Sequence, residues 1–191
     1  MASKIVSSRP QDKIIAGDPE IAQLALADLA KSGITDADAI KSLGLVALTA
    51  EQTLSRVKFN SRSYEIPYFG IDGRPMTYRT PEGKVRPFVR YKLLDEVRNG
   101  DGKTIKYGQA KGSGIHLYLP QLPGLDWKAV ADDPAQRILV VEGAKKAICA
   151  FLRLNTPAIS VDGVWSFRTP DLDLFKWKGR EVVIVYDSDL V

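Results

Sequence analysis

The chain has 191 residues, of which 45% are hydrophobic and 26% charged, so it can form one ordinary soluble domain or two small ones. No apolar run reaches the roughly 18 residues of a membrane span, and the first 13 residues have no apolar core of a secretory signal. One cysteine, Cys149, excludes an internal disulfide, and one histidine, His116, excludes a Cys/His zinc site. These features favour a cytoplasmic protein.

Positive charge is concentrated in the middle of the chain. The formal net charge is +4, whereas residues 56–111 alone hold 13 Lys/Arg and 6 Asp/Glu, a balance of +7. The remaining residues therefore carry a balance of −3. A basic segment beside an acidic end suits a polyanion held next to a metal site. A solvated surface without a ligand has the same composition, and charge alone favours that simpler interpretation.

Residues 1–58 are predicted to form a small helical region. Helices are expected at 19–31, 35–43 and 50–57. Asp18, Thr35 and Thr49 are the residue types that cap the start of a helix, and Gln52 completes a capping box with Thr49. We expect this region to serve in docking or packing.

Residues 59–134 are predicted to form a basic, mixed β region. A hairpin is expected with Asp72-Gly73 at its turn, followed by a strand that begins at Val85 and a polar loop over 95–104. Four aromatic side chains can stack on bases or pack in a core, and the core is favoured for strand residues. They are Tyr68, Tyr78, Phe88 and Tyr91.

Four lysines are candidates for contact with nucleic-acid or nucleotide phosphates. Lys106 and Lys111 precede a glycine-rich turn, Gly112–Gly114, whose backbone can approach phosphates closely, although an ordinary surface hairpin fits equally well. Lys145 and Lys146 open a helix, where the dipole disfavours cations, so nearby carboxylates or phosphate would explain them. A solvated lysine pair is the alternative. His116 and Cys149 are expected to pack.

Residues 135–191 predict an α/β domain with a parallel sheet. A continuous apolar strand, ILVV, ends at Glu142 and is followed by a helix, AKKAICAFLRL. Two further strands are expected in TPAISVDG and at 181–186. Ligands of open α/β sheets sit beyond the carboxyl ends of the strands, where Glu142, Asp187 and Asp189 fall. Three converging carboxylates would repel unless a cation lay between them, and oxygen ligands suit Mg²⁺.

The α/β part resembles the toprim domain of primases, topoisomerases and related nucleases. The resemblance rests on LVVEG before a helix and on YDSD at a later strand end. Upstream, IPYFGIDGRPMTYRT and KYGQAKGSGIHLYLP are similar to the basic segment before the toprim part of bacterial primases. A closer likeness is to the toprim-like domain of phage and plasmid replication proteins, often joined to a helicase. It is carried by EGAKKA, DGVWSF, WKGR and YDSD.

This resemblance implies a toprim-like sheet and joining of nucleotides on a single-stranded DNA template with Mg²⁺ or Mn²⁺. Glu142 would be a general base or metal ligand, and Asp187 and Asp189 would be metal ligands. One alternative is a nucleic-acid-binding module of a phage or plasmid replication helicase, without catalysis; another is a toprim nuclease. Bacterial primases carry an acid where this chain has Lys146, which weakens transfer of their mechanism. The domain is expected to be incomplete, because toprim domains continue beyond the position of Val191.

Overall fold

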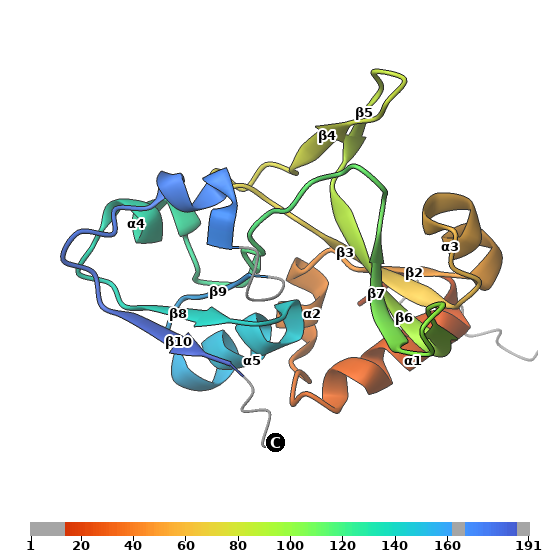
Figure 1. Cartoon of the computed structure of the whole chain (residues 1–191). Helices are drawn as coiled ribbons and strands as arrows, with labels where there is room; N and C mark the ends of the chain where they lie inside the picture. Colours follow the sequence, from red (N-terminus) through yellow and green to blue (C-terminus); the bar gives the residue numbers. More distant parts are fainter. Residues whose placement is uncertain (1–13, 162–166, 187–191) are drawn as a thin grey trace, which may run out of the picture.

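The computed structural model describes residues 14–161 and 167–186, which form three sheets and the helices packed against them (Figure 1). Two of these sheets contain parallel strand pairs. The chain is therefore a mixed α/β protein, as the sequence predicted at that level. Within the described residues, every helix is too short or too polar to cross a membrane.

A five-stranded sheet is formed by residues from the N-terminal part of the chain. In the order β1-β2-β3-β6-β7, its strands are Ala16–Gly17, Val46–Leu48, Ser63–Pro67, Val89–Arg98 and Thr104–Gln109. β1 pairs with β2 in parallel, and the other neighbours are antiparallel. β1 and β2 come from the segment that was predicted to be helical alone. They are two and three residues long, too short for an alternating pattern to reveal.

Three N-terminal helices lie close to their predicted positions: α1 (Pro19–Ala30), α2 (Ala37–Ser42) and α3 (Ala50–Val57). Asp18 caps α1 by accepting hydrogen bonds from two backbone N–H groups, and Thr49 caps α3 in a capping box with Gln52. The predicted cap of the second helix was wrong by one residue. Asp36, not Thr35, accepts the hydrogen bond from Ala39 N, at 2.7 Å.

A three-stranded parallel sheet follows, with the order β10-β8-β9. Its strands are β10 (Val182–Val185), β8 (Ile138–Val141) and β9 (Ala158–Ser160). All four residues of β8 are buried, as expected for the central strand of a parallel sheet. Helix α5 (Ala144–Leu154) connects β8 to β9, while α4 (Trp127–Asp132) and a 3₁₀ helix (Pro170–Leu174) flank the sheet. The predicted order of strands and helix is confirmed.

A separate two-stranded hairpin projects from the body of the protein (Figure 1). It consists of β4 (Thr77–Arg79) and β5 (Val85–Pro87). The predicted hairpin around Asp72-Gly73 is reduced to a turn closed by a single bridge between Phe69 and Pro75. The predicted turn is confirmed, with hydrogen bonds from Gly70 N to Arg74 O and from Met76 N to Tyr68 O, but the pairing does not extend into β3, which already pairs with β2 and β6 on its two sides. Residues 77–79 therefore pair with β5 instead.

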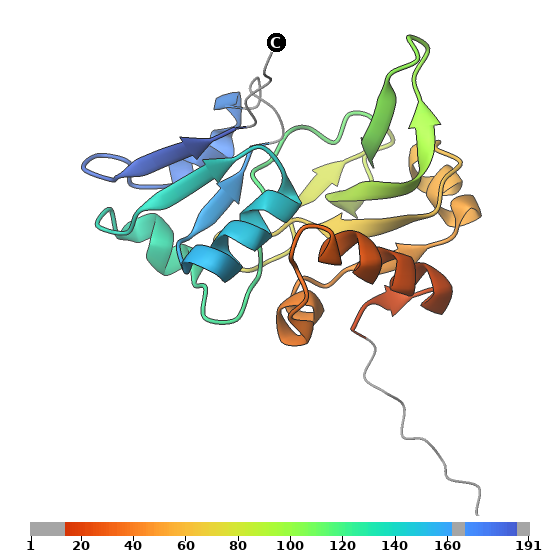
Figure 2. The same ribbon diagram turned by 90° about the horizontal axis from the view of Figure 1, so that it is seen from below.

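One hydrophobic core joins the two large sheets. Buried side chains from Ile15 to Ala158 belong to the same cluster, including Leu29 of α1 and Ile148 of α5. Figure 2 shows α1 and α5 on the same side of the molecule, each beneath its own sheet. This arrangement places the start of α5 beside the end of α1.

Candidate functional site

Glu142 lies at the carboxyl edge of the parallel sheet. It follows β8 directly, and Gly143 then begins α5 as its N-cap residue. β10 pairs with β8 so that Val185 is opposite Val141, which brings Tyr186 level with Glu142. Burial and the negative charge of Glu142 both raise the pKa of Tyr186 above its ordinary value. Asp187 and Asp189 lie outside the described residues, so only the first of the three predicted acids is placed.

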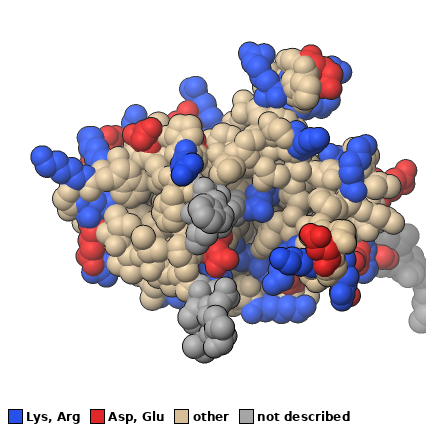
Figure 3. All heavy atoms as spheres, viewed as in Figure 1, with Lys and Arg blue, Asp and Glu red and all other residues tan. Residues whose placement is uncertain are grey.

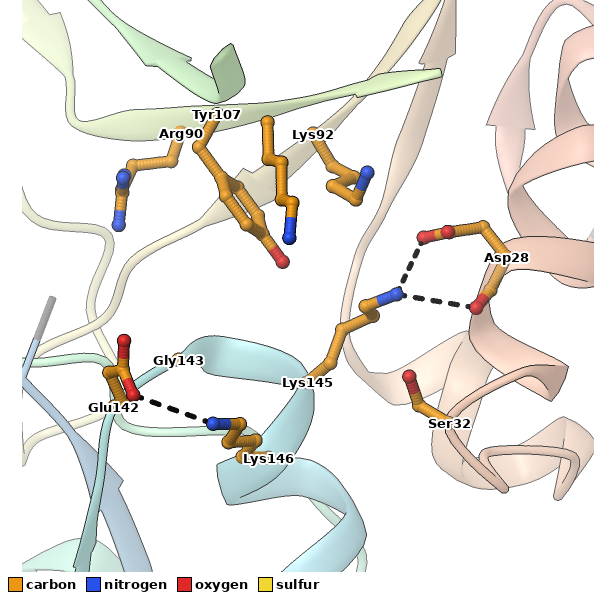
Figure 4. Close-up of a pocket in the computed structure, with 10 residues that line it drawn as sticks. Asp28, Ser32, Arg90, Lys92, Tyr107, Glu142, Gly143, Lys145 and Lys146 are labelled. Carbon is orange, nitrogen blue, oxygen red and sulfur yellow. Dashed lines mark hydrogen bonds and ion pairs between the residues drawn. The ribbon is translucent and has the colours of Figure 1, made fainter. Parts of the chain in front are cut away.

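A cleft of about 560 Å³ opens beside Glu142, between the two large sheets (Figure 4). From the five-stranded sheet, β6 and β7 contribute Arg90, Lys92, Lys106 and Tyr107. From the parallel sheet, the segment after β8 contributes Glu142, Gly143, Lys145 and Lys146. Figure 4 shows the labelled side chains of Arg90, Lys92 and Tyr107 facing those of Glu142 and Lys145 across the opening. The cleft therefore has an excess of positive charge.

The cations of β6 gather around one aromatic ring. The ring centroid of Tyr107 lies 5.1 Å from the guanidinium carbon of Arg90 and 5.5 Å from the ammonium of Lys92. Burial, together with repulsion from Lys145 and Lys106, lowers the pKa of Lys92, although Asp28 opposes this shift. Such crowding of like charges favours binding of an anion, because an anion would relieve the repulsion.

Asp28 of α1 fixes Lys145 at the cleft wall. Its Oδ2 atom accepts hydrogen bonds from the ammonium of Lys145 and from the buried hydroxyl of Tyr64, both at 2.9 Å. Burial alone would raise the pKa of Asp28, but the bond from Lys145, the charge of Lys92 and the bond from Tyr64 together lower it. The carboxylate is therefore held ionised. An N-terminal helix to which the sequence assigned no chemistry thus supplies part of the site.

Lys146 forms an ion pair with Glu142, with 3.5 Å between Nζ and Oε2. Both side chains are a little over two-fifths exposed, so the pair is accessible to solvent and weak. Together with the Lys145–Asp28 pair, it explains why α5 begins with two cations despite its dipole, since each lysine faces a carboxylate. Gly143, which lines the cleft, provides no side-chain cap for α5.

The structure brings together four of the seven predicted site residues. Glu142, Lys106, Lys145 and Lys146 line one cleft, whereas Lys111 is exposed on the turn after β7 and is not among the described residues that line it. The sequence interpretation missed five of the side chains that line the cleft. They are Asp28, Ser32, Arg90, Lys92 and Tyr107. The spacing of Arg90 and Lys92, which share a strand face, was a usable signal; nothing local in the sequence distinguishes Asp28.

The remaining candidates have structural roles. Tyr68, Phe88 and Tyr91 are buried, which confirms the core alternative for these aromatics, and Tyr78 is half-buried. His116 was expected only to pack, yet its Nδ1 lies 3.1 Å from Oδ2 of Asp171. The bond from His116 contributes to a lowered pKa for Asp171, although burial opposes it. Cys149 is half-buried on α5.

The comparisons with known proteins add one finding. A family model described as a domain of unknown function (DUF3854) matches residues 126–191, which is less than half of the chain. The matched range contains Glu142 together with Asp187 and Asp189. Neither a curated protein nor a solved structure was found to match the chain. Within residues 14–161 and 167–186, no three His, Cys, Asp or Glu side chains are grouped closely enough to hold a metal.

Proposed function

We propose that this chain is a toprim-type module of a cytoplasmic DNA replication protein. It holds single-stranded DNA and nucleotides in the basic cleft beside a Mg²⁺ site and joins nucleotides on the DNA template there. The observation that carries the proposal is the cleft itself. Cations from β6, β7 and α5 face Glu142 at the carboxyl edge of a parallel sheet, where α/β proteins bind their ligands.

The side chain of Glu142 fits a ligand of a hard divalent cation. Its carboxylate is partly exposed, so a cation can reach it and displace the ammonium of Lys146. In the sequence, Asp187 and Asp189 follow β10, the parallel neighbour of β8, and their carboxylates would supply the further oxygen ligands that Mg²⁺ prefers. The bound ion would neutralise negative charge on phosphate.

The other residues of the cleft would bind the phosphates and bases of the nucleic acid. Arg90, Lys92 and Lys106 bind phosphates, and the ring of Tyr107 offers a face on which a base can stack. Asp28 keeps the ammonium of Lys145 pointed at the same space. Glu142 would hold the metal, or would accept a proton from the attacking hydroxyl.

A binding module without catalysis is the second candidate, and the Lys146–Glu142 pair favours it. An ammonium 3.5 Å from the carboxylate occupies a position where primases carry another acid, and it competes with a metal. In that case the chain holds DNA for a fused or separate helicase. A toprim nuclease is a third outcome of the same test.

The test is a template-dependent nucleotide-joining assay with Mg²⁺ and with Mn²⁺. Glu142→Gln keeps the size of the side chain but removes its charge, so it should abolish joining and leave DNA affinity nearly unchanged. Glu181→Gln is the matched control, because Glu181 is an exposed acid whose ion pair with Arg137 lies at the surface. A wild type that binds DNA but joins nothing would support the binding module. Cutting of DNA by the wild type alone would support the nuclease.

A further inference from the structure

The projecting hairpin carries more positive charge than its own structure requires. Residues 77–87, which we call the basic arm, contain Arg79, Lys84 and Arg86 but only one acid, Glu82. All three cations are exposed. The arm is closed by a tight turn, with Gly83 N donating to Thr80 O at 2.8 Å and Thr80 N to Lys84 O at 2.9 Å.

The cations of the basic arm lie on both of its faces. Arg86 is directly opposite Tyr78, and Arg79 is directly opposite Val85. Paired residues of an antiparallel ribbon share a face and successive residues alternate, so Arg86 and Arg79 point in opposite directions. Figure 3 shows Lys and Arg side chains on both sides of the projection. A surface that docked on a flat partner would need charge on one face only.

Positive charge is not a general property of projecting hairpins in this protein. The tip between β6 and β7 also extends into solvent, but it carries more acids than cations over residues 95–104. There, Nε of Arg98 donates to Glu96 at 2.8 Å, so the cation is locally neutralised. This second tip provides a natural control for the basic arm.

The root of the basic arm is packed into the protein and leads into the cleft. Phe88 follows β5, is buried, and packs edge-on against Tyr68 and His116, with ring centroids 4.9 and 4.6 Å apart. The backbone N–H of Phe88 also donates to Met76 O at 2.7 Å. Directly beyond Phe88, β6 presents Arg90 and Lys92 to the cleft. One run of chain therefore carries cations from the arm tip to the candidate site.

We infer that the basic arm binds the double-stranded part of a nucleic acid whose single-stranded part lies in the cleft. The major groove is about 12 Å wide and admits a two-stranded ribbon, whose strands are about 4.8 Å apart. Phosphates line both rims of a groove, which matches cations on both faces of the arm. The inference rests on the proposed binding of nucleic acid in the cleft, but not on metal chemistry there.

The test compares two DNA probes by fluorescence anisotropy over a salt series. One probe is a hairpin duplex with a single-stranded overhang, and the other is the overhang sequence alone. Arg79→Ala, Lys84→Ala and Arg86→Ala combined should weaken binding of the duplex probe about tenfold or more and reduce its salt slope by about 2 to 3. Affinity for the single strand should change by less than about twofold. The matched control, Arg98→Ala with Lys103→Ala at the other tip, should change neither.

Each other outcome has a defined meaning. Equal loss on both probes, or no loss on either, would overturn the inference. A competition experiment gives a further outcome that would overturn it. If polyglutamate displaced the duplex probe from the protein as effectively as unlabelled duplex DNA does, the arm would fit an acidic protein partner instead. Lys92→Ala with Lys106→Ala separates the two proposals. If this double variant weakens binding of the single strand while the arm variant has no effect on either probe, only the present inference fails. If the wild type binds neither probe, the proposed function fails as well.

Discussion

Replacing Asp28 with alanine removes the carboxylate that links α1 to the start of α5. The Tyr64 hydroxyl, which is buried, then loses its acceptor at 2.9 Å, which costs about 1 to 3 kcal/mol. The Lys145 ammonium, whose side chain is only 17% exposed, loses its carboxylate, which adds about 1 to 2 kcal/mol. We expect Asp28→Ala to lower the free energy of unfolding by about 2 to 5 kcal/mol, a large part of the roughly 5 to 15 kcal/mol of a typical domain.

Urea denaturation at pH 7 measures this difference. Glu181→Ala is the control, because Glu181 and Arg137 form an ion pair at 2.8 Å in which both side chains are more than half exposed. Its loss should cost less than about 1 kcal/mol. A change of less than about 0.5 kcal/mol for Asp28→Ala would refute the argument that this carboxylate stabilises the junction of α1 and α5.

A comparison of wild type with Asp28→Asn tests the pKa of Asp28. Because folding lowers this pKa below its ordinary value of 3.8, the stabilisation by the ionised carboxylate is present above about pH 4 and is lost as the pH falls further. The stability difference between wild type and Asp28→Asn should therefore be constant from pH 5 to 7 and shrink below about pH 4. If the stability difference instead grew as the pH fell, the pKa of Asp28 would not be lowered by folding.

Three further predictions concern the cleft and the backbone. Lys146→Ala removes the ammonium beside Glu142, so Mg²⁺ should bind about two- to fivefold more tightly in calorimetric titration; weaker binding would mean that Lys146 helps rather than competes. Lys92→Ala with Lys106→Ala should lower single-stranded DNA affinity and reduce its salt slope by about 1 to 1.5, and an unchanged slope would place the phosphate contacts elsewhere. Gly17→Ala would place its Cβ 2.1 Å from Ala47 O at a φ of +94°, so it should lower the melting temperature and cost at least about 2 kcal/mol. A stable Gly17→Ala protein would contradict the pairing of β1 with β2.

Local signals were enough to predict most helices and the parallel strands. The capping box at Thr49 and the continuous apolar run of β8 are short-range patterns, and both predicted their elements correctly. The partner of β4 was not predictable in this way, because it depends on which edges of β3 are already occupied. The hydrogen bond from Lys145 to Asp28 spans 117 residues and requires the packing of α1 against the rest of the fold. Sequence patterns find the strand end that bears Glu142, but not the distant side chains that complete the cleft wall.

The hydrophobic cluster that runs from Ile15 to Ala158 has a consequence for how the protein folds. Because α1 and α5 bury their apolar faces in the same cluster, removing either part would expose this cluster to water, although each part keeps a smaller cluster of its own. We expect the described residues to unfold in a single cooperative transition, with amide exchange in β3 and β8 governed by the same opening free energy. A fragment that began at residue 135 would expose Leu139, Val141 and Ile148 to water and should aggregate, even though it contains Glu142 and both aspartates of the candidate metal site.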